Sequence, residues 1–330
     1  MKAIVVSAPG PESELEIQDV PQPKPGPGHV LVRIVATALN RADLLQRAGH
    51  YPPPPGASEI LGLEMAGVIE SRGPDCSGTF ATGDRVMALL PGGGYAAYAV
   101  VPEALLMRIP ERLSFTEAAA IPEVFLTAFQ AVYWLGELKS DETVLLHAGG
   151  SGVSTAAIQL AVHQGSAVFV TASEAKHNAC KALGAAAAID YKTAAFEDVI
   201  SELTDKRGVD LIVDYIGAPY FAANIASLAT DGRLVVLAMM GGSKVSAVNL
   251  MQLFRKRIHV KTSTLRSRSA PYKAALTAAF VEKFGDALIA GDINPVIDGV
   301  YNWQDAEAAH ARMRGNLNTG KIVLSVSESA

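Results

Sequence analysis

The chain has 330 residues, of which 49% are hydrophobic, and a formal net charge of −5 at pH 7. A chain of this length can bury a sizeable core and is long for one domain, so we expect two domains. The negative charge argues against broad attraction to nucleic acid or to an anionic membrane surface. The longest apolar runs, such as VVLAMM at 235–240, are far shorter than the ~20 residues of a membrane-spanning helix.

The N-terminal sequence MKAIVVSAPG has one lysine and a very short apolar run before a turn. This pattern predicts a first strand rather than a secretory signal, so we expect a cytoplasmic protein with no membrane partner. The two cysteines, Cys76 and Cys180, lie far apart and have no ligand-like spacing. They support neither a disulfide framework nor a cysteine zinc site, and we expect two free thiols.

The first 120 residues contain short β-rich segments, such as HVLVRIVA and YAAYAVV, separated by proline and glycine clusters such as PQPKPGPGH and YPPPPG. This pattern predicts an irregular, mostly antiparallel β domain. From Leu126 onward, predicted strands and helices alternate. In order they are strand TVLLHA, helix GVSTAAIQLAVHQG, strand AVFVTA, helix EAKHNACKALG, and strands AAAID, VDLIVDYIG and RLVVLAM. Apolar strands bounded by amphipathic helices predict a parallel sheet covered on both faces.

The alternation ends near Thr262, where the long helical pattern YKAALTAAFVEKFGDALIAG precedes a short strand, a helix and the strand GKIVLSV. This tail does not extend the parallel sheet, so we expect it to return to the first domain. The expected division is therefore residues 1–123 and 266–330 for the mostly β domain, with residues 124–265 as the α/β domain.

The segment HAGGSGVS, at 147–154, lies between a predicted strand and a predicted helix. That context gives weight to a glycine fingerprint of the dinucleotide-binding type. Small residues let the backbone approach a pyrophosphate, whose charge the helix N-terminus attracts. An ordinary glycine-rich turn is the alternative. The loop residues predicted to contact the cofactor are Gly149, Gly150, Ser151, Gly152 and Val153, and Ser154 takes the third fingerprint position.

The residues after the strand AVFVTA indicate which dinucleotide binds. An NAD site usually has an acidic residue here that accepts from the ribose hydroxyl. Ser173 and Lys176 instead offer a hydroxyl and an ammonium group suited to a 2′-phosphate, although Glu174 lies between them. The sequence favours NADPH. Tyr191 is a candidate for stacking on the adenosine end, with simple surface packing as its alternative.

Four segments are similar to a known family: ALNRADLLQRAGHYPPPPGASEILGLEMAG, ALLPGGGYAAYAVVPEALL, AAAIPEVFLTAF and LLHAGGSGVSTAAIQLA. They resemble the zinc-independent quinone oxidoreductases of the medium-chain dehydrogenase/reductase superfamily, and the resemblance extends from the first predicted strand to TGKIVLSV. It implies an α/β protein with a GroES-like, mostly β catalytic domain and a Rossmann domain with a doubly wound parallel sheet. It also implies an NADPH-dependent reductase of small quinones, chiefly ortho-quinones.

The same superfamily includes zinc alcohol dehydrogenases, so the residues must decide whether a metal is expected. Those enzymes have a cysteine near the position of Asn40 and a G-H-E sequence where this chain has Gly62, Leu63 and Glu64. Catalytic zinc needs three protein ligands, and leucine cannot supply one. The seven histidines are scattered. We predict no metal, and we expect Glu64 to pair with a nearby arginine.

Without a metal, hydrogen-bond donors must stabilise the negative charge that hydride transfer places on a carbonyl oxygen. The resemblance implies that Tyr51 and Ser151 are catalytic and also contact the cofactor. Consecutive prolines after Tyr51 stiffen its loop. Packing on the proline turn is the alternative for Tyr51, and a helix N-cap is the alternative for Asn40. The resemblance implies further cofactor contacts at Asn40, Ile216, Met240, Gly241, Leu265, Ser267 and Asn318.

Two other functions stay open. The same hydride geometry suits an enone or an enoyl thioester, and the basic segment RKRIHVK at 255–261 leaves room for an NADPH sensor that binds RNA. We interpret that segment as a strand with basic flanks, so nucleic acid is not the expected partner. A strand near RIHVKTSTL, at a sheet edge, is predicted to pair with its symmetry mate in a homodimer or homotetramer formed through the Rossmann domain.

Overall fold

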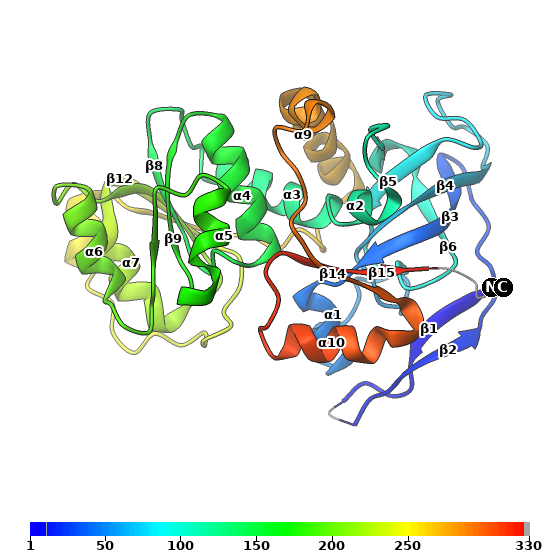
Figure 1. Cartoon of the computed structure of the whole chain (residues 1–330), viewed down its shortest axis with the longest axis horizontal. Helices are drawn as coiled ribbons and strands as arrows, with labels where there is room; N and C mark the ends of the chain where they lie inside the picture. Colours follow the sequence, from blue (N-terminus) through cyan, green and yellow to red (C-terminus); the bar gives the residue numbers. More distant parts are fainter. Residues whose placement is uncertain (11, 327–330) are drawn as a thin grey trace. The chain divides into compact units, whose positions relative to one another are not determined.

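The computed structural model describes residues 1–10 and 12–326. The chain divides into two compact units, which can be followed by colour in Figure 1. Unit 1 comprises Met1–Leu126 and Leu265–Ala330, and unit 2 comprises Thr127–Thr264. Residues 327–330 of the expected segment 266–330 lie outside the described residues.

Unit 1 is mainly a β structure. Within the described residues it has a seven-stranded sheet in the order β14-β15-β3-β4-β5-β7, with β6 paired to β3, and a separate β1-β2 pair. Neighbouring strands of the sheet are antiparallel except β14 and β15. The strands are β1 (Lys2–Val6), β2 (Leu15–Asp19), β3 (His29–Ala38), β4 (Glu64–Arg72), β5 (Arg85–Leu89), β6 (Tyr98–Pro102), β7 (Leu106–Arg108), β14 (Ile297–Asn302) and β15 (Lys321–Ser325).

The helices of unit 1 come from both of its chain segments. They are α1 (Arg41–Arg47), α2 (Phe115–Ala119), α9 (Ala270–Ala290) and α10 (Ala306–Arg314), with short turns η1 (Glu103–Leu105) and η5 (Trp303–Asp305). Helix α3 (Pro122–Phe129) carries the chain across the boundary into unit 2. The tail after residue 265 thus supplies α9, α10 and two strands of the unit 1 sheet.

Strand β3 organises the core of unit 1. Its side chains Val30, Val32 and Ile34 alternate along the strand and join one buried cluster with residues of β4 and β5. Burying each such side chain contributes about 1.5–3 kcal/mol relative to leaving it exposed. A second buried cluster, which includes Leu39 and Tyr95, lies beneath α10. These two clusters fix the chain on both sides of Asn40 and Glu64.

Unit 2 is an α/β structure with a parallel sheet. Its described residues form six strands in the order β10-β9-β8-β11-β12-β13, and every neighbouring pair is parallel. The strands are β8 (Thr143–Leu146), β9 (Ala167–Thr171), β10 (Ala187–Ile189), β11 (Val209–Asp214), β12 (Leu228–Val236) and β13 (His259–Thr262). By chain order within the unit this is 3-2-1-4-5-6, the order of dinucleotide-binding domains. The predicted parallel sheet is confirmed.

Helices cover both faces of the unit 2 sheet. Figure 1 shows α4 and α5 on one side of it, and α6 and α7 on the other. The helices are α4 (Gly152–His163), α5 (His177–Ala182), α6 (Phe196–Leu203), α7 (Phe221–Ser227) and α8 (Leu250–Lys256), with the π-helix η2 (Gln130–Leu135) and the short 3₁₀ helices η3 (Glu174–Lys176) and η4 (Ala218–Tyr220). Because Leu146 pairs with Val170 and Val213, the carboxyl ends of the three central strands meet at one edge.

The basic segment at 255–261 is not one strand. Arg255 and Lys256 end α8, and the strand begins only at His259. The ammonium group of Lys256 donates to the carbonyls of residues 225, 226 and 228 over 3.2, 2.7 and 2.6 Å, and Arg257 pairs with Asp231 at 2.6 Å. Lys261 also pairs with Glu137 at 2.7 Å, so three of the four cations in this segment have partners within unit 2.

In the part of the chain that the structure describes, none of the helices has the length and apolar character needed to cross a membrane.

Candidate active site

The segment 147–154 forms a tight turn between β8 and α4. Ser151 is the N-cap of α4, and its Oγ accepts from the backbone N–H of Ser154 over 3.2 Å. Ser154 is buried and donates its hydroxyl to the carbonyl of His147 over 2.8 Å. The two serines of the altered fingerprint therefore hold the turn to the helix. Because the Ser151 oxygen acts as acceptor in the cap, its own proton is available to another group.

Other side chains approach two glycines of this turn closely. A Cβ on Gly149 would lie 2.8 Å from Cβ of Val170 and 3.0 Å from the Cys180 sulfur. A Cβ on Gly150 would lie 2.4 Å from Cδ of Lys176. The Lys176 stem therefore packs on the turn at Gly150, so the turn and the region after the second strand form one surface.

The residues after β9 are arranged as a cap and a short helix. Ser173 is the N-cap of η3, which contains Glu174 and Lys176. Ser173 and Lys176 are partly buried, whereas Glu174 is exposed. The carboxylate of Glu174 thus lies in solvent, while the cation adjoins the turn at the N-terminus of α4. A hydroxyl, an ammonium group and a helix N-terminus together suit a phosphate.

A buried carboxylate organises the loop after β11. Asp214 is fully buried and accepts from the N–H groups of Ile216 at 2.6 Å and Gly217 at 3.2 Å. The same loop contacts the segment that follows β12, because Met240 N–H donates to the Tyr215 carbonyl over 3.0 Å. Gly241 N–H likewise donates to the Ile216 carbonyl over 2.8 Å. The structure therefore brings Ile216, Met240 and Gly241 together.

The Asp214 network continues to the start of the glycine turn. Asn224 Nδ2 donates to Asp214 over 3.1 Å, and Asn224 Oδ1 lies 2.7 Å from His147 Nε2. The other imidazole nitrogen lies 2.8 Å from the Thr171 hydroxyl. Burial lowers the pKa of His147 to about 4, so the ring is neutral and donates through Nε2 to the amide oxygen. Sequence reasoning missed His147, Asn224 and Asp214; the polar residue that ends VDLIVD was the available signal.

All predicted cofactor residues of unit 2 follow the carboxyl ends of parallel strands. Tyr191 comes after β10 and is 46% exposed, so its ring is accessible to a ligand. In open α/β sheets ligands bind at this end of the strands, where the strand order reverses. Here the order reverses between β8 and β11, next to the glycine turn. The arrangement fits a dinucleotide.

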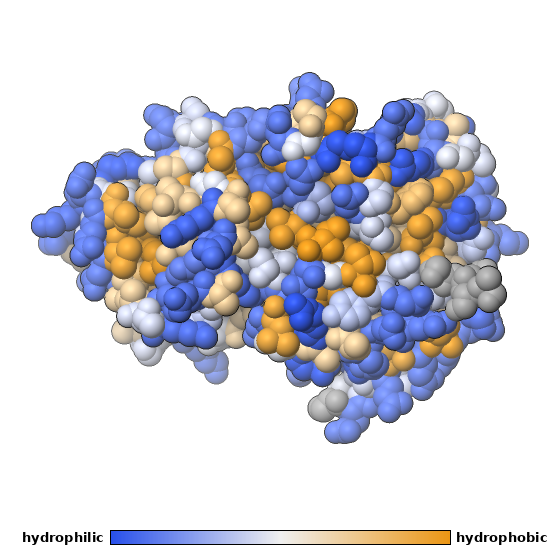
Figure 2. Space-filling view, in the orientation of Figure 1, coloured by the Kyte–Doolittle hydropathy of each residue, from blue (hydrophilic) through white to orange (hydrophobic). Residues whose placement is uncertain are grey.

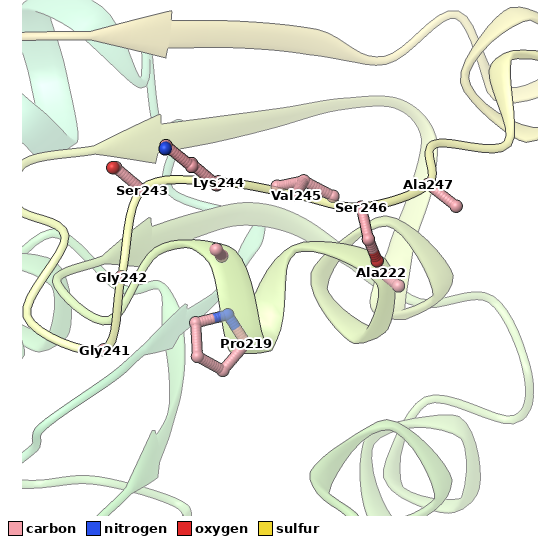
Figure 3. A pocket seen from close by; sticks show the side chains of 10 residues that line it. Pro219, Ala222, Gly241, Gly242, Ser243, Lys244, Val245, Ser246 and Ala247 are labelled. Atoms are coloured by element: carbon pink, nitrogen blue, oxygen red, sulfur yellow. The ribbon is translucent and has the colours of Figure 1, made fainter.

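A hollow of roughly 600 Å³ lies beside this region. Figure 3 shows Pro219 and Ala222 on one side of it and the segment from Gly241 to Ala247 passing over them. None of its lining residues belongs to the glycine turn, and Gly241 is the one predicted cofactor residue among them. The strand ends, rather than this hollow, mark the candidate site of unit 2.

Unit 1 contains a buried polar cluster around Asn40 and Glu64. Lys321 donates to Glu64 at 2.6 Å, to the Leu39 carbonyl at 2.6 Å and to Asn40 Oδ1 at 2.7 Å. Asn40 Nδ2 donates to Glu64 at 2.9 Å and to the Ala38 carbonyl at 3.3 Å. Glu64 was predicted to pair with an arginine; its partner is a lysine. The Asn40 amide, at the N-cap position of α1, has both N–H donors in use.

These residues do not fit a catalytic zinc ion. The Glu64 carboxylate is taken by an ammonium group and an amide, and Leu63 offers no ligand atom. Among the described residues, no three side chains of histidine, cysteine, aspartate or glutamate gather in a way that could hold a metal ion.

A second buried network adjoins this cluster. Asp43 accepts from the Asn40 N–H at 2.8 Å and from the Tyr95 hydroxyl at 3.4 Å, and Tyr95 lies 3.1 Å from His310 Nε2. Burial raises the pKa of Asp43 to about 6 and lowers the pKa of His310 to about 3. Both shifts favour the neutral forms inside the core. The sequence analysis did not single out Asp43, Tyr95 or His310.

Tyr51 is partly buried beside Arg266, whose Cζ lies 5.2 Å from the centroid of its ring. Burial raises the pKa of the Tyr51 phenol. Leu265 is buried and Ser267 is exposed. Asn318 precedes β15 and donates to the Gly320 carbonyl over 2.8 Å. The structure thus places Tyr51 against Arg266, whose chain neighbour is Leu265, while Asn318 is close in sequence to Lys321.

Two family models match this chain. The alcohol dehydrogenase GroES-like domain matches residues 26–111, and the zinc-binding dehydrogenase family matches residues 152–281. The predicted fold class, a GroES-like domain with a Rossmann domain, is confirmed.

The chain is similar to curated proteins of two different kinds, among others. The human synaptic vesicle membrane protein VAT-1 homolog is 31% identical over 340 residues, which cover 98% of this chain and 86% of that protein. A phenolphthiocerol synthesis polyketide synthase of Mycobacterium bovis, Pks15/1, is 38% identical over 233 residues, which cover 70% of this chain. The chain spans only 10–14% of the length of the polyketide synthases that it matches.

Three solved structures share the fold over nearly the whole chain. A quinone oxidoreductase of Pseudomonas syringae pv. tomato is 32% identical with a TM-score of 0.86, covering 98% of this chain and 99% of that one. The mycobacterial protein Rv1454c complexed with NADPH is 30% identical with a TM-score of 0.86, at 99% and 100% coverage. The CurK enoyl reductase is 26% identical with a TM-score of 0.87, at 99% coverage of each chain.

Proposed function

Because the chain belongs to the medium-chain dehydrogenase/reductase superfamily, we propose that it is an NADPH-dependent quinone oxidoreductase that works without zinc. Within that superfamily we propose a resemblance to the tumour-suppressor-inducible quinone oxidoreductase, on the basis of the motifs around Tyr51 and the glycine turn. The proposed substrates are small quinones, chiefly ortho-quinones, and the proposed location is the cytoplasm. The observation that best supports NADPH as the cofactor is that the Lys176 stem packs on Gly150, beside the N-terminus of α4.

The residues of unit 2 would hold the cofactor. The glycine turn and α4 would bind the pyrophosphate, and Ser173 with Lys176 would bind the 2′-phosphate. The NADPH complex of the mycobacterial relative supports the same choice. When bound, NADPH supplies a hydride to the acceptor. The other residues that we propose as cofactor contacts are Asn40, Tyr51, Tyr191, Ile216, Met240, Gly241, Leu265, Ser267 and Asn318.

Hydride transfer places negative charge on the acceptor oxygen, and we assign its stabilisation to Tyr51 and Ser151. Burial raises the pKa of Tyr51, which keeps the phenol protonated and able to donate at neutral pH. Ser151 accepts from the Ser154 N–H, which leaves its hydroxyl proton for the ligand. Fixed donors of this kind are worth about 10²–10³-fold in rate.

The test is NADPH oxidation with 1,2-naphthoquinone. We expect turnover with NADPH to exceed turnover with NADH, and a Tyr51→Phe/Ser151→Val variant to lose about 10²-fold or more. If wild-type turnover were no higher than that of the double variant, the catalytic roles of Tyr51 and Ser151 would be wrong. Added chelator should leave turnover unchanged, because the Asn40, Leu63 and Glu64 positions do not offer zinc ligands.

The second candidate function is that of an enone or enoyl reductase. The fold that the chain shares with the CurK enoyl reductase supports this candidate. Both substrate classes accept a hydride and develop negative charge on an oxygen. Measured side by side, a higher kcat/KM for an enone or enoyl thioester than for the quinone would select this second function.

We also propose that unit 2 forms the contact of a homodimer or homotetramer, with a second copy as the partner. Strand β13 is the sheet edge, and Val260 on it is 44% exposed. On α8, Leu250, Met251 and Phe254 are 72%, 54% and 78% exposed. Scattered apolar residues are ordinary, as on the face in Figure 2, but a group beside an unpaired strand edge is suited to association.

Light scattering tests this contact. We expect the mass of a dimer or tetramer for the wild type and a monomer for Val260→Lys/Phe254→Lys, because buried ammonium groups oppose both strand pairing and apolar contact. A monomeric wild type would contradict the proposal.

A further inference from the structure

The Tyr51 side chain lies against one buried guanidinium group, that of Arg266. Arg266 is 7% exposed, and its Cζ lies 5.2 Å from the Tyr51 ring centroid. Its Nη1 also donates to the Tyr51 backbone carbonyl over 3.3 Å. One side chain therefore contacts both the ring and the backbone of the same tyrosine.

The other guanidinium nitrogens are fixed by two further bonds. Nε donates to the Pro91 carbonyl over 2.8 Å, and Nη2 donates to Gln46 Oε1 over 2.7 Å. Gln46 in turn donates to the Glu59 carbonyl over 2.9 Å. The loop that begins at Tyr51 is thus joined, through Arg266, to α1 and to the chain at Pro91.

The backbone of Arg266 is also held. The Lys273 ammonium group donates to the Arg266 carbonyl over 2.6 Å, and Lys273 is only 6% exposed. Within residues 1–10 and 12–326, neither cation forms an ion pair with a carboxylate. The Arg266 charge is therefore not cancelled by a contacting anion, and it acts on the ring that it covers.

We propose that Arg266 is a positioning residue that fixes the orientation of Tyr51 and favours donation from its phenol to the acceptor oxygen. This inference rests on the proposed function, which gives Tyr51 its role as donor. A phenol that donates a strong hydrogen bond gains negative charge on its oxygen, and a nearby cation stabilises that charge. The planar guanidinium also restricts rotation of the ring, which lysine does less well.

Two charged groups act on the Tyr51 phenol. Burial raises its pKa, the Arg266 charge opposes that rise, and the Glu123 carboxylate adds to it. Removing the guanidinium leaves burial and Glu123 unopposed. The Tyr51 pKa should therefore rise in an Arg266→Met variant, and the phenol should become a weaker donor.

The first experiment compares steady-state kinetics with NADPH and 1,2-naphthoquinone. For Arg266→Met we expect kcat to fall about tenfold or more with a smaller change in KM, because a misplaced donor weakens the transition state most. Arg266→Lys keeps the charge and should recover part of kcat. The matched control is Arg85→Met: Arg85 lies 4.8 Å from the Phe115 ring and donates to the Leu113 carbonyl, and its loss should leave kcat within twofold.

A double-mutant cycle separates positioning from general damage. If Arg266 acts through the phenol, Arg266→Met should have no further effect on kcat in a Tyr51→Phe background. An equal loss in both backgrounds would overturn the proposal. Thermal unfolding of each variant identifies any that fails to fold. If Arg266→Met fails to fold, the double-mutant cycle is repeated with Arg266→Lys in its place.

The second experiment needs no turnover. Tyrosinate absorbance is titrated with pH, and the difference between each protein and its Tyr51→Phe counterpart reports the Tyr51 pKa. We expect a higher pKa in Arg266→Met than in the wild type, and an unchanged pKa would refute the role of Arg266. A shifted pKa in a protein without quinone turnover would reject the proposed function alone.

Discussion

Lys321 is 3% exposed, yet its ammonium group has three acceptors, in Glu64, Asn40 and the Leu39 carbonyl. Taking two charges out of water is costly, and only close geometry with further hydrogen bonds offsets that cost. Here Glu64 also accepts from the Asn40 amide and the Glu123 N–H. The charged and polar groups of this cluster therefore satisfy one another, which explains why its residues do not offer ligands to a metal.

Replacing only Lys321 should lower the free energy of unfolding far more than replacing Lys321 together with the charge of Glu64. For Lys321→Met we expect a loss of about 3–5 kcal/mol in the free energy of unfolding, because Glu64 is left charged and buried. Lys321→Met/Glu64→Gln should lose less. Urea unfolding measures both.

A surface pair supplies the control for Lys321. Lys2→Met breaks an exposed ion pair with Asp19 and should lower the free energy of unfolding far less than Lys321→Met does, because water screens the exposed charges. Equal losses for Lys321→Met and Lys2→Met would show that the Glu64 pair is not buried in solution.

Gly150 links the glycine turn to the choice of cofactor. In Gly150→Ala the new Cβ would meet the Lys176 stem at 2.4 Å, so the flexible lysine must move. We expect Kd for NADPH to rise about tenfold while Kd for NADH changes little, since a displaced ammonium would no longer reach the 2′-phosphate that we propose it binds. Fluorescence titration with both cofactors measures this. Gly26→Ala, which meets nothing within 4 Å, is the control, and an equal change for both cofactors would contradict the role of Lys176.

Individual strands and helices were predicted correctly from the sequence, because the local pattern of apolar residues determines where they form. The strand TVLL, the helix after the glycine turn and the long helix in the tail all form, as β8, α4 and α9. The strand order of unit 2 and the partner of Glu64 depend on long-range contacts. Lys321 and Asn40 are 281 residues apart, so no local pattern joins them. Asp214 and His147 were missed because single polar residues at strand ends resemble ordinary turn residues.

Helix α4 gives Ser151 a structural role beside its proposed catalytic one. Ser151→Ala removes the N-cap acceptor and should lower the free energy of unfolding by about 0.5–2 kcal/mol. Ser151→Asp keeps a cap and should retain stability, but its carboxylate repels a pyrophosphate and lacks a donor proton, so activity should be lost. Urea unfolding and NADPH oxidation measure the two roles. A Ser151→Ala variant as stable as the wild type would contradict the cap.

At the scale of the whole molecule, each unit holds one fully buried, neutral histidine. Burial lowers the pKa of His147 in unit 2 to about 4 and that of His310 in unit 1 to about 3, from an ordinary value of 6.5. Below pH 6.5 the unfolded chain binds protons that the folded chain does not. The stability that each neutral ring contributes is therefore complete above pH 6.5 and is lost as the pH falls toward the folded pKa. Asp43 opposes this trend, because burial raises its pKa to about 6 and its protonation favours the folded state.

Comparison of a single-histidine variant with the wild type isolates this effect from Asp43. One histidine contributes about 1.4 kcal/mol per pH unit, so His147 should account for about 2 kcal/mol of the stability lost between pH 7 and 5. His147→Asn should remove that part of the loss, whatever its own effect on stability at pH 7. Urea unfolding at the two pH values measures the difference, with His50→Asn, at an exposed position, as the control. The same loss in wild type and His147→Asn would mean that His147 takes up its proton without unfolding unit 2.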